Sequence, residues 1–519
     1  MASWNLVQPK WIDEASRGGF GHLVTSWPAQ LILAAAVGLG LGGAAIVVTG
    51  SNSRFAPLLL AGLLAPFIVA VVGRVRYVLL ILLIITIPTG PDIYLGYREA
   101  IGMLGGIGGW NISLGTVALG GLYALWIGAA LTGVAYAPRP ALREARPVFL
   151  YLLLNIVSIL FARDVFASLF ETFWLIQIVL MFLYVASTVE TRRDVYVILA
   201  AMMAALAIES IIMIGVAATG VTFEVAGIST RVTTTSVYAG GFTRAAGTLG
   251  SPNAAGAYLA FLLAPALSLT ICHLPKRLRW LGGVAFALGT VALILTLSRG
   301  SLLSFGIAVM VLTAIGLHRR WFAASTIVAM AAVGIVVAVI FGPTLVARLF
   351  GEDHGAAEAR IPLMQIAFLV IGDHPLGVGL NNFTAVLPAY VGPQFSTQFI
   401  YSVHNYYLTI WAEIGPVGLV AFLWILAAAV RRAWACAHTL GPDLAPFAVA
   451  VFGSLLGESV HMFVDVYKSW AQLDSLFLVA GLLIALTRLG RADVAGRPAN
   501  RWVRLPAFIP DYRTTGVGG

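Results

Sequence analysis

Apolar runs about the length of a membrane-spanning helix recur along nearly the whole chain. An α-helix rises about 1.5 Å per residue, so about 20 apolar residues cross the ~30 Å hydrocarbon core of a bilayer. Two of the runs are short, so the pattern predicts an all-α polytopic membrane protein with about 12–14 transmembrane helices. The fourteen runs fall near residues 28–49, 55–72, 77–88, 112–135, 147–162, 166–187, 195–218, 253–272, 279–297, 300–317, 321–341, 404–430, 443–464 and 471–488.

The composition excludes an ordinary soluble protein. Of the 519 residues, 60% are hydrophobic and 10% are charged, whereas soluble domains average about 45–50% and about 25%. The formal net charge of +9 raises the question of nucleic-acid binding. In a membrane protein, however, basic loops that set the topology explain such an excess, so no nucleic-acid partner is predicted.

The basic residues orient the predicted helices. With the N-terminus in the cytoplasm and alternating spans, 22 of the 31 Lys and Arg residues fall in cytoplasmic segments. Every cytoplasmic loop then holds at least two of them, as the positive-inside rule requires. Both termini are predicted to be cytoplasmic, and residues 1–27 form a leader without the features of a cleaved signal peptide. Cys272 and Cys436 lie beside basic clusters on the same side and suggest neither a disulfide nor a metal site.

These boundaries divide the chain into five parts. The leader at 1–27 is followed by a transmembrane bundle at 28–341, which contains an outer loop at 219–252. A large periplasmic loop occupies 342–403, the C-terminal transmembrane helices occupy 404–488, and a basic cytoplasmic tail occupies 489–519. Both long loops are predicted to be extracytoplasmic.

Three arginines on the outer side suggest an anionic ligand. Arg244, Arg299 and Arg360 lie near span ends beside the long loops or between two apolar runs. An arginine near the hydrocarbon boundary is costly unless it pairs with an anion or faces water. Each of them alone is explained equally well by a side chain that reaches the lipid headgroups. Three together favour a ligand with phosphate oxygens, which suit the guanidinium fork.

The motifs around these arginines have readable local structure. Arg244 begins a segment that runs through Ser251 and Pro252 to Asn253, in which Ser251 is placed to cap a helix and Pro252 to begin it. Residues 297–301 form a tight polar break centred on Arg299. Residues 356–371 predict a helix along the membrane surface, with Arg360 near its start.

His404 is the candidate proton acceptor. It lies at the predicted outer mouth of a helix, next to Asn405. With an ordinary pKa of about 6.5, a histidine there can take a proton from a hydroxyl near neutral pH. The alternative is an interfacial histidine whose ring is satisfied by a backbone carbonyl.

Buried acidic residues form a second group of candidates. Glu171, Glu209 and Glu413 lie within apolar runs, where ionisable groups either serve function or pair structurally inside the bundle. Glu458, His461 and Asp465 cluster near the outer end of the thirteenth run and could line a cavity. Their helical spacing also fits a metal ligand set, but no second cluster supports that interpretation, and no cofactor is predicted.

Taken together, these stretches resemble the O-antigen ligase and polymerase superfamily of bacterial envelope glycosyltransferases. The resemblance covers about residues 195–488 and is most specific where His404-Asn405 is followed, nine residues later, by Gly415-Pro-Val-Gly418. Other matching segments are residues 244–253, 296–300, 360–367 and 374–381, with His461 and Asp465 similar to the polar patch of the family's closing helices.

The resemblance implies a GT-C-like bundle in the bacterial cytoplasmic (inner) membrane and a periplasmic active site. It implies transfer of a glycan from undecaprenyl pyrophosphate to an acceptor hydroxyl, with inversion and without a metal, either onto lipid A core or onto a growing glycan. Arg299 and Arg360 would bind the pyrophosphate with help from Arg244, and His404 would deprotonate the acceptor. Asn405, Asn253, His461 and Asp465 would support the site.

Other classes of protein make different demands on the sequence. A transporter or flippase of lipid-linked oligosaccharides should show paired halves and basic residues along a path across both leaflets. Here the polar residues gather on one face, and no internal repeat is evident. A structural scaffold gives no reason for the His404 segment. Membrane lipids, the lipid-linked donor and the glycan acceptor are the predicted partners.

Overall fold

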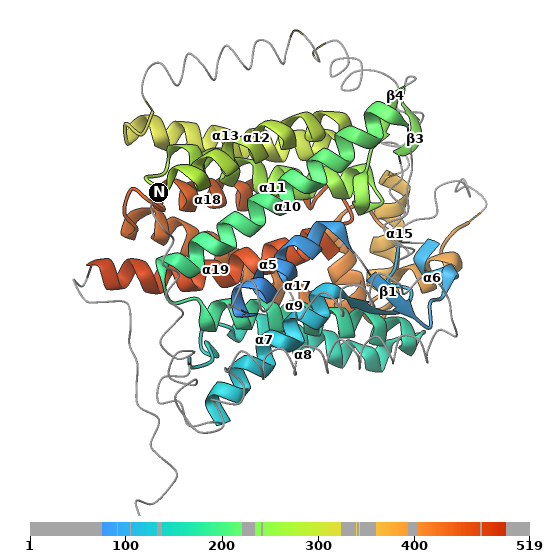
Figure 1. Cartoon of the computed structure of the whole chain (residues 1–519). Helices are drawn as coiled ribbons and strands as arrows, with labels where there is room; N and C mark the ends of the chain where they lie inside the picture. The colour runs from blue at the N-terminus through green and yellow to red at the C-terminus, as the bar shows by residue number, and fades with distance from the viewer. Residues whose placement is uncertain are drawn as a thin grey trace, which may run out of the picture.

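The protein is a bundle of apolar helices with small elements gathered at one end (Figure 1). The computed structural model describes residues 75–90, 92–103, 105–131, 138–220, 234–239, 242–322, 339, 342, 360–392, 402–467 and 470–494. The predicted leader, the runs at 28–49 and 55–72, nearly all of the run at 321–341 and the end of the basic tail lie outside these residues. The division of the chain into five parts therefore stays a prediction.

Helices occur where the sequence predicted eleven of the fourteen runs, within the described part of the chain. Eight are long and apolar enough to span a membrane, and three shorter ones are also apolar. The long helices are α7 (Leu114–Leu131), α9 (Val165–Thr188), α10 (Arg192–Thr219), α11 (Pro252–Ile271), α12 (Lys276–Thr296), α13 (Arg299–His318), α17 (Tyr406–Thr439) and α19 (Trp470–Val494). The shorter ones are α5 (Val75–Thr89), α8 (Arg146–Ser158), continued by η2 (Ile159–Phe161), and α18 (Ala445–His461). The prediction of an all-α polytopic membrane protein is confirmed.

Local sequence signals begin several of these helices. Asp164 caps α9 by accepting a hydrogen bond from the backbone N–H of Ala167, and Thr191 and Asp194 form a reciprocal capping box on α10. Pro252 takes the first position of α11, as predicted, but the side chain of Ser251 makes no capping hydrogen bond. Each cap satisfies backbone N–H groups that the start of a helix leaves without an intrahelical partner.

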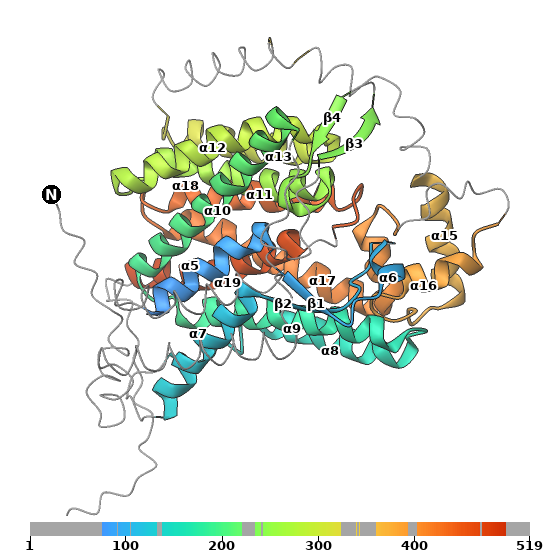
Figure 2. The ribbon, with the colours of Figure 1, turned by 45° about the vertical axis from the view of Figure 1, so that its right-hand side comes forward.

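The helices of the bundle pack around one large apolar core. α11 is the most enclosed of the spanning helices and packs against α12, α13 and α18, while α19 packs against α9 and α17. α10 contacts α12 and α5, which joins the N-terminal helices to the rest. Figure 2 shows the same arrangement from a second side. The core is built of leucine, alanine, valine and aromatic side chains with almost no exposed surface.

Short elements define the end of the bundle that we call the loop end. It contains two antiparallel hairpins, β1 (Asp92–Leu95) with β2 (Trp110–Ser113) and β3 (Thr234–Ala239) with β4 (Phe242–Ala245). Neither hairpin was predicted, because each strand is too short to show a period in the sequence. The other elements there are α6 (Glu99–Met103), η3 (Gly247–Leu249), α15 (Arg360–Asp373), α16 (Phe383–Val386) and η4 (Leu387–Ala389).

α15 confirms the predicted helix with Arg360 near its start, although residues 356–359 lie outside the described part. The helix runs across the loop end, steeply inclined to the spanning helices (Figures 1 and 2). One face packs on α17 through Leu363, Ile366 and Val370, while Phe368 and Leu369 are exposed. A helix that is apolar on its exposed face and lies across the bundle suits the interfacial position predicted from the sequence.

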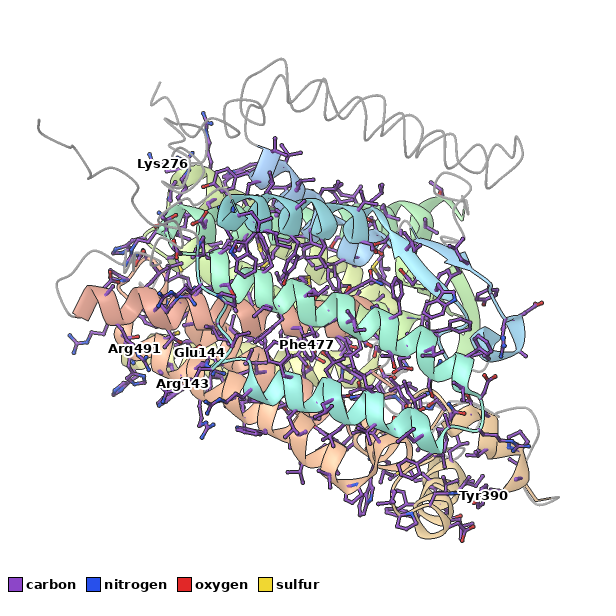
Figure 3. All side chains as sticks on the ribbon, turned by 90° about the horizontal axis from the view of Figure 1, so that it is seen from below. Arg143, Glu144, Lys276, Tyr390, Phe477 and Arg491 are labelled. Carbon is purple, nitrogen blue, oxygen red and sulfur yellow. The ribbon has the colours of Figure 1, made fainter. Side chains whose placement is uncertain are left out.

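The opposite end of the bundle, which we call the basic end, collects cationic residues. Arg143, Lys276 and Arg491 lie there, while Tyr390 lies at the loop end (Figure 3). A buried ion pair joins α5 to α10 at the basic end, with Arg76 Nη1 2.6 Å from Asp194 Oδ1. Arg192 pairs with both Asp443 and Asp493. The segregation of charge between the two ends agrees with the positive-inside pattern of the sequence.

Candidate active site at the loop end

A break in α17 supports the candidate site. Gly415 has φ 75° and ψ 179°, which no other residue adopts without strain, and Pro416 follows it inside the helix. Proline has no N–H to donate to the carbonyl four residues earlier, so the carbonyl of Ala412 is left free. It accepts a hydrogen bond from the N–H of Val378, and the carbonyl of Glu413 accepts one from Gly379, both at 2.9 Å.

Two glycines of the 374–381 motif allow close backbone contacts that other residues would prevent. Gly377 and Gly379 have φ of 92° and 93°, and a Cβ on Gly377 would collide with the backbone of Glu413. Gly377 therefore allows the loop backbone to approach the broken helix closely, and Gly379, whose Cβ would collide with the backbone of Ala162, allows it to approach the end of η2. The two glycine motifs that carried the family resemblance, at 415–418 and 374–381, thus pack against each other.

Two asparagines attach the same loop to the N-terminal helices. Asn381 donates to the carbonyls of Ile107 and Ala167, and Asn382 accepts from the N–H of Asp164 and donates to Ser168 Oγ. Both side chains are buried. Because buried amides with several hydrogen bonds hold one geometry, this loop is a rigid support at the loop end.

The segment that carries His404 is fixed on both sides. Asn405 caps α17, its Oδ1 accepting a hydrogen bond from the N–H of Leu408 at 3.1 Å. The N–H of Tyr406 donates to the carbonyl of Met462 at 2.8 Å, which joins this segment to the end of α18. His404, the residue before the cap, is therefore held next to the segment that follows His461. The role of Asn405 in the structure is to begin α17.

His404 is partly buried, and nearby charged groups change the pKa of its ring. Burial lowers the pKa of the His404 imidazole below its ordinary value. The negative charge of Asp465 opposes that shift, while the positive charge of Arg360 adds to it, and a backbone interaction with Ser402 opposes it. A lowered pKa keeps the ring neutral at pH 7, which is the form that accepts a proton. Arg360, the first residue of α15, also acts electrostatically on His461.

His461 is held between two carboxylates. Its Nδ1 lies 3.3 Å from Glu458 Oε2, and its Nε2 lies 3.6 Å from Asp465 Oδ2. Ser304 of α13 donates to the other oxygen of Glu458 at 2.8 Å. All three members of the Glu458–His461–Asp465 cluster are almost fully buried. Among the described residues, no group of His, Cys, Asp or Glu has the arrangement of a metal site.

Arg299 is brought to this cluster by its neighbour. Leu297 ends α12 in the left-handed region, at φ 48°, and Arg299 begins α13. A Cβ on Gly300 would lie only 2.5 Å from Cδ2 of His461, so glycine lets the start of α13 touch that ring. Arg299 itself is partly exposed. The predicted residues Arg299, Arg360, His404, His461 and Asp465 are thus brought together at the loop end.

Arg244 differs from the other two arginines. It is buried in β4, its Nε donates to the carbonyl of Thr296, and its Nη2 donates to Asn253 Oδ1, both at 2.7 Å. These bonds tie the β3–β4 hairpin to the end of α12 and the start of α11. Arg244 and Asn253 therefore brace the segment that leads to Arg299, and bracing is the better-supported role for both.

Sequence reasoning missed one residue of this site and gave another no role of its own. It noted Glu458 only as part of a cluster, and it did not consider Ser304. A serine inside an apolar run is common and carries no signal by itself. Only the packing of α13 against α18 shows that Ser304 meets a carboxylate that orients His461.

The segment that contains Arg299, Arg360 and His404 matches a known family. Residues 284–423 match the family model described as O-antigen ligase. This segment is similar to the O-antigen ligase family. The match begins within α12 and ends within α17, so it includes both glycine motifs and Asn405, and the resemblance seen in the sequence is confirmed. No curated protein matches the chain.

The similarity of this segment to the O-antigen ligase family supports an O-antigen ligase/polymerase-type glycosyltransferase activity in general terms. Such an activity implies a lipid-linked glycan and an acceptor as partners. Arg244, Asn253, His461 and Asp465 lie outside the matched O-antigen ligase segment. Their place beside it rests on the hydrogen bonds and packing described above.

Proposed function

We propose that this protein transfers a glycan from undecaprenyl pyrophosphate to an acceptor hydroxyl at the periplasmic face of the bacterial inner membrane, with the loop end as that face. One observation carries the proposal. The positive charge of Arg360 is close enough to influence both His404 and His461 electrostatically. Gly300, the neighbour of Arg299, packs on His461. Two cationic side chains from separate helices therefore share one place with a histidine whose lowered pKa keeps it neutral.

The proposed reaction needs one proton acceptor and one anion site. The acceptor oxygen attacks the anomeric carbon of the donor from the side opposite the pyrophosphate, which inverts that carbon. The new C–O bond forms as the bond to the phosphate oxygen breaks, and the pyrophosphate leaves with the electron pair. The hydroxyl proton passes to the neutral imidazole of His404. Arg299 and Arg360 stabilise the charge that develops on the leaving pyrophosphate.

Supporting residues fix these groups before substrate binds. Glu458, Ser304 and Asp465 orient His461, which touches the start of α13 and hence sets the position of Arg299. Asn405 and the backbone of Tyr406 set the position of His404. Preorganised charge of this kind lowers a barrier because nothing has to reorient during the reaction.

The purified protein in lipid, given native undecaprenyl-pyrophosphate glycans in the presence of a chelator, tests the proposal. Samples with and without lipid A core are compared by gel. A ladder of lengthening chains without lipid A core identifies a polymerase, and a single shift of lipid A core identifies a ligase. If neither appears and the glycan lipid only changes leaflets in vesicles, the protein is a flippase and the proposal is wrong.

Arg360→Ala and Arg319→Ala provide a matched pair in the same assay. Arg319 lies at the basic end, where it donates to the carbonyl of Ala437. We expect Arg360→Ala to lower transfer by about a hundredfold or more, as for loss of one electrostatic contact in a transition state. Arg319→Ala should leave transfer within about twofold. Equal effects of the two variants would remove Arg360 from the anion site.

A further inference from the structure

Glu209 is a buried acid that the proposed reaction does not use. It lies in the half of α10 nearer the loop end, and its side chain has no exposed surface. Both carboxyl oxygens face Thr248 of η3. Oε1 accepts a hydrogen bond from the N–H of Thr248 at 2.9 Å, and Oε2 lies 2.5 Å from Thr248 Oγ1.

The protons around Thr248 can be counted. Its hydroxyl carries one proton, and its Oγ1 lies 2.7 Å from the carbonyl oxygen of Pro88 as well as 2.5 Å from Glu209 Oε2. A carbonyl oxygen only accepts hydrogen bonds, so the Thr248 proton must lie toward Pro88. The short contact with Glu209 then needs a second proton, and only the carboxyl group can carry it. A deprotonated carboxylate would face the lone pairs of Oγ1.

The surroundings of Glu209 agree with a neutral acid. Within the described residues, no lysine or arginine forms an ion pair with it. On α5, Arg76 lies at the basic end and pairs with Asp194, and the cations of α12 are at its start there. On β4, Arg244 is bonded to Thr296 and Asn253. The remaining titratable neighbour is Tyr258 of α11, which is uncharged at neutral pH. A lone charge buried among apolar helices is costly, whereas a protonated acid is not.

Glu209 also shapes the segment that it contacts. Gly247 has φ 60°, and a Cβ on it would collide with Oε1 of Glu209. Gly247 and Thr248 therefore pack directly on the carboxyl group, midway between Arg244 and Asn253. Pro88, at the end of α5, closes the third side through Thr248. The carboxyl group thus joins α10, α5 and the segment 244–253 at one point.

We propose that Glu209 is held as a neutral carboxylic acid and is the positioning residue of the segment 244–253. It donates one hydrogen bond to Thr248 Oγ1 and accepts one from the Thr248 N–H, which holds Arg244 against the ends of α11 and α12. Its effect on glycan transfer rests on the proposed function, but its protonation and its hold on the segment do not.

Infrared difference spectroscopy of the full-length protein tests the protonation without any substrate. A neutral carboxylic acid has a C=O stretching band that a carboxylate lacks, and Glu209→Gln should remove one such band. Thr248→Val, which removes the hydroxyl that accepts from the acid, should shift the same band, and Thr248→Ser should restore it. If Glu209→Gln removes no such band, or Thr248→Val leaves the band in place, the proposal is wrong.

Hydrogen exchange and transfer assays test the positioning. Glu209→Gln keeps one donor and one acceptor, so hydrogen exchange in the peptide 244–251 should stay near the wild-type rate, whereas Glu209→Ala should raise the exchange rate about tenfold or more.

If the proposed function is right, glycan transfer by the wild type falls at alkaline pH, where ionised Glu209 can no longer donate to Thr248. Glu209→Gln should keep its transfer rate there. Unchanged exchange in Glu209→Ala overturns the positioning role. If neither the wild type nor any variant transfers glycan but the spectral changes are present, only the proposed function is wrong.

Discussion

His404 and His461 lie close together but have different surroundings. His461 is enclosed by carboxylates and by the start of α13, and its side chain is almost fully buried. His404 is partly exposed, and burial together with Arg360 keeps its pKa low. A general base must be both accessible and neutral, so His404 suits that role and His461 suits a supporting one.

Replacement of His404 by alanine should stop glycan transfer while the protein remains folded in the membrane. The expected loss is about a hundredfold to ten-thousandfold, the usual contribution of a positioned general base. His438→Ala is the matched control, because His438 is an exposed histidine at the opposite, basic end of α17, the helix that begins just after His404. Transfer rates are measured on both purified variants. Near wild-type transfer by His404→Ala would show that another group accepts the proton.

The pH dependence of transfer should report the surroundings of His404. Transfer requires the neutral ring, so it is retained above the pKa of His404 and lost as pH falls through it. Because that pKa is lowered, the acid loss should come below pH 6.5, the ordinary value. Asp465 raises the pKa, so Asp465→Asn should move the acid loss to still lower pH. A shift of the pH–rate profile in the opposite direction would contradict the assigned proximity of Asp465 to His404.

Helix α17 supports the backbone of the loop end. The break at Gly415 and Pro416 frees two carbonyls, and the loop at 376–382 uses both of them. Glu413, predicted either to serve function or to pair structurally, accepts a hydrogen bond from the N–H of Phe383 through its side chain. The described contact is structural, and it strengthens the same junction between α17 and the loop.

Gly415→Ala should weaken this junction. An alanine at φ 75° and ψ 179° costs roughly 1–3 kcal/mol of backbone strain, and its Cβ would lie 3.0 Å from the carbonyl oxygen of Leu376. Both the thermal unfolding midpoint and transfer should fall. Gly306→Ala in α13 is the control, since its Cβ would meet no atom within 4 Å and alanine favours a helix. A Gly415→Ala variant as stable as Gly306→Ala would show that the left-handed backbone at 415 is not required.

The candidate site and the cluster of basic residues lie at opposite ends of the molecule. The hairpins and α15 lie at the loop end (Figure 1), together with the candidate site. Arg143, Lys276 and Arg491 lie at the basic end (Figure 3), together with the ion pairs of Arg76 and Arg192. A transporter needs polar groups along a path through the membrane, whereas a membrane transferase needs them on one face. The distribution among the described residues fits the second case.

Thiol labelling in intact cells should establish which end faces outward. Ala389→Cys places an exposed thiol in η4 at the loop end, and Arg491→Cys places one at the basic end. An impermeant maleimide should label Ala389→Cys in intact cells and Arg491→Cys only after lysis. The native Cys272 and Cys436 are buried and should contribute little background. The reverse pattern would invert the proposed topology and place the site in the cytoplasm.

The apolar runs of the sequence predicted where the eight long and three shorter apolar helices of the described regions lie, because membrane spans need long apolar runs and such runs are visible without a structure. It also singled out Arg299, Arg360 and His404, because charged and titratable groups at span ends are costly and therefore rare. The helix that begins at Arg360 was predicted from the apolar residues within 356–371. These features depend on local composition alone.

How these residues meet could be seen only once the helices were packed together. That Arg244 bonds to Thr296 and Asn253 depends on strand β4 meeting the end of α12 and the start of α11, which no local pattern encodes. The same holds for the contact of Gly300 with His461 and for the hydrogen bonds of Glu209 to Thr248. Side-chain hydrogen bonds between residues far apart in the chain depend on the packing of whole helices, and that packing is set by the sum of many weak contacts. Such a sum becomes readable only once the helices are placed.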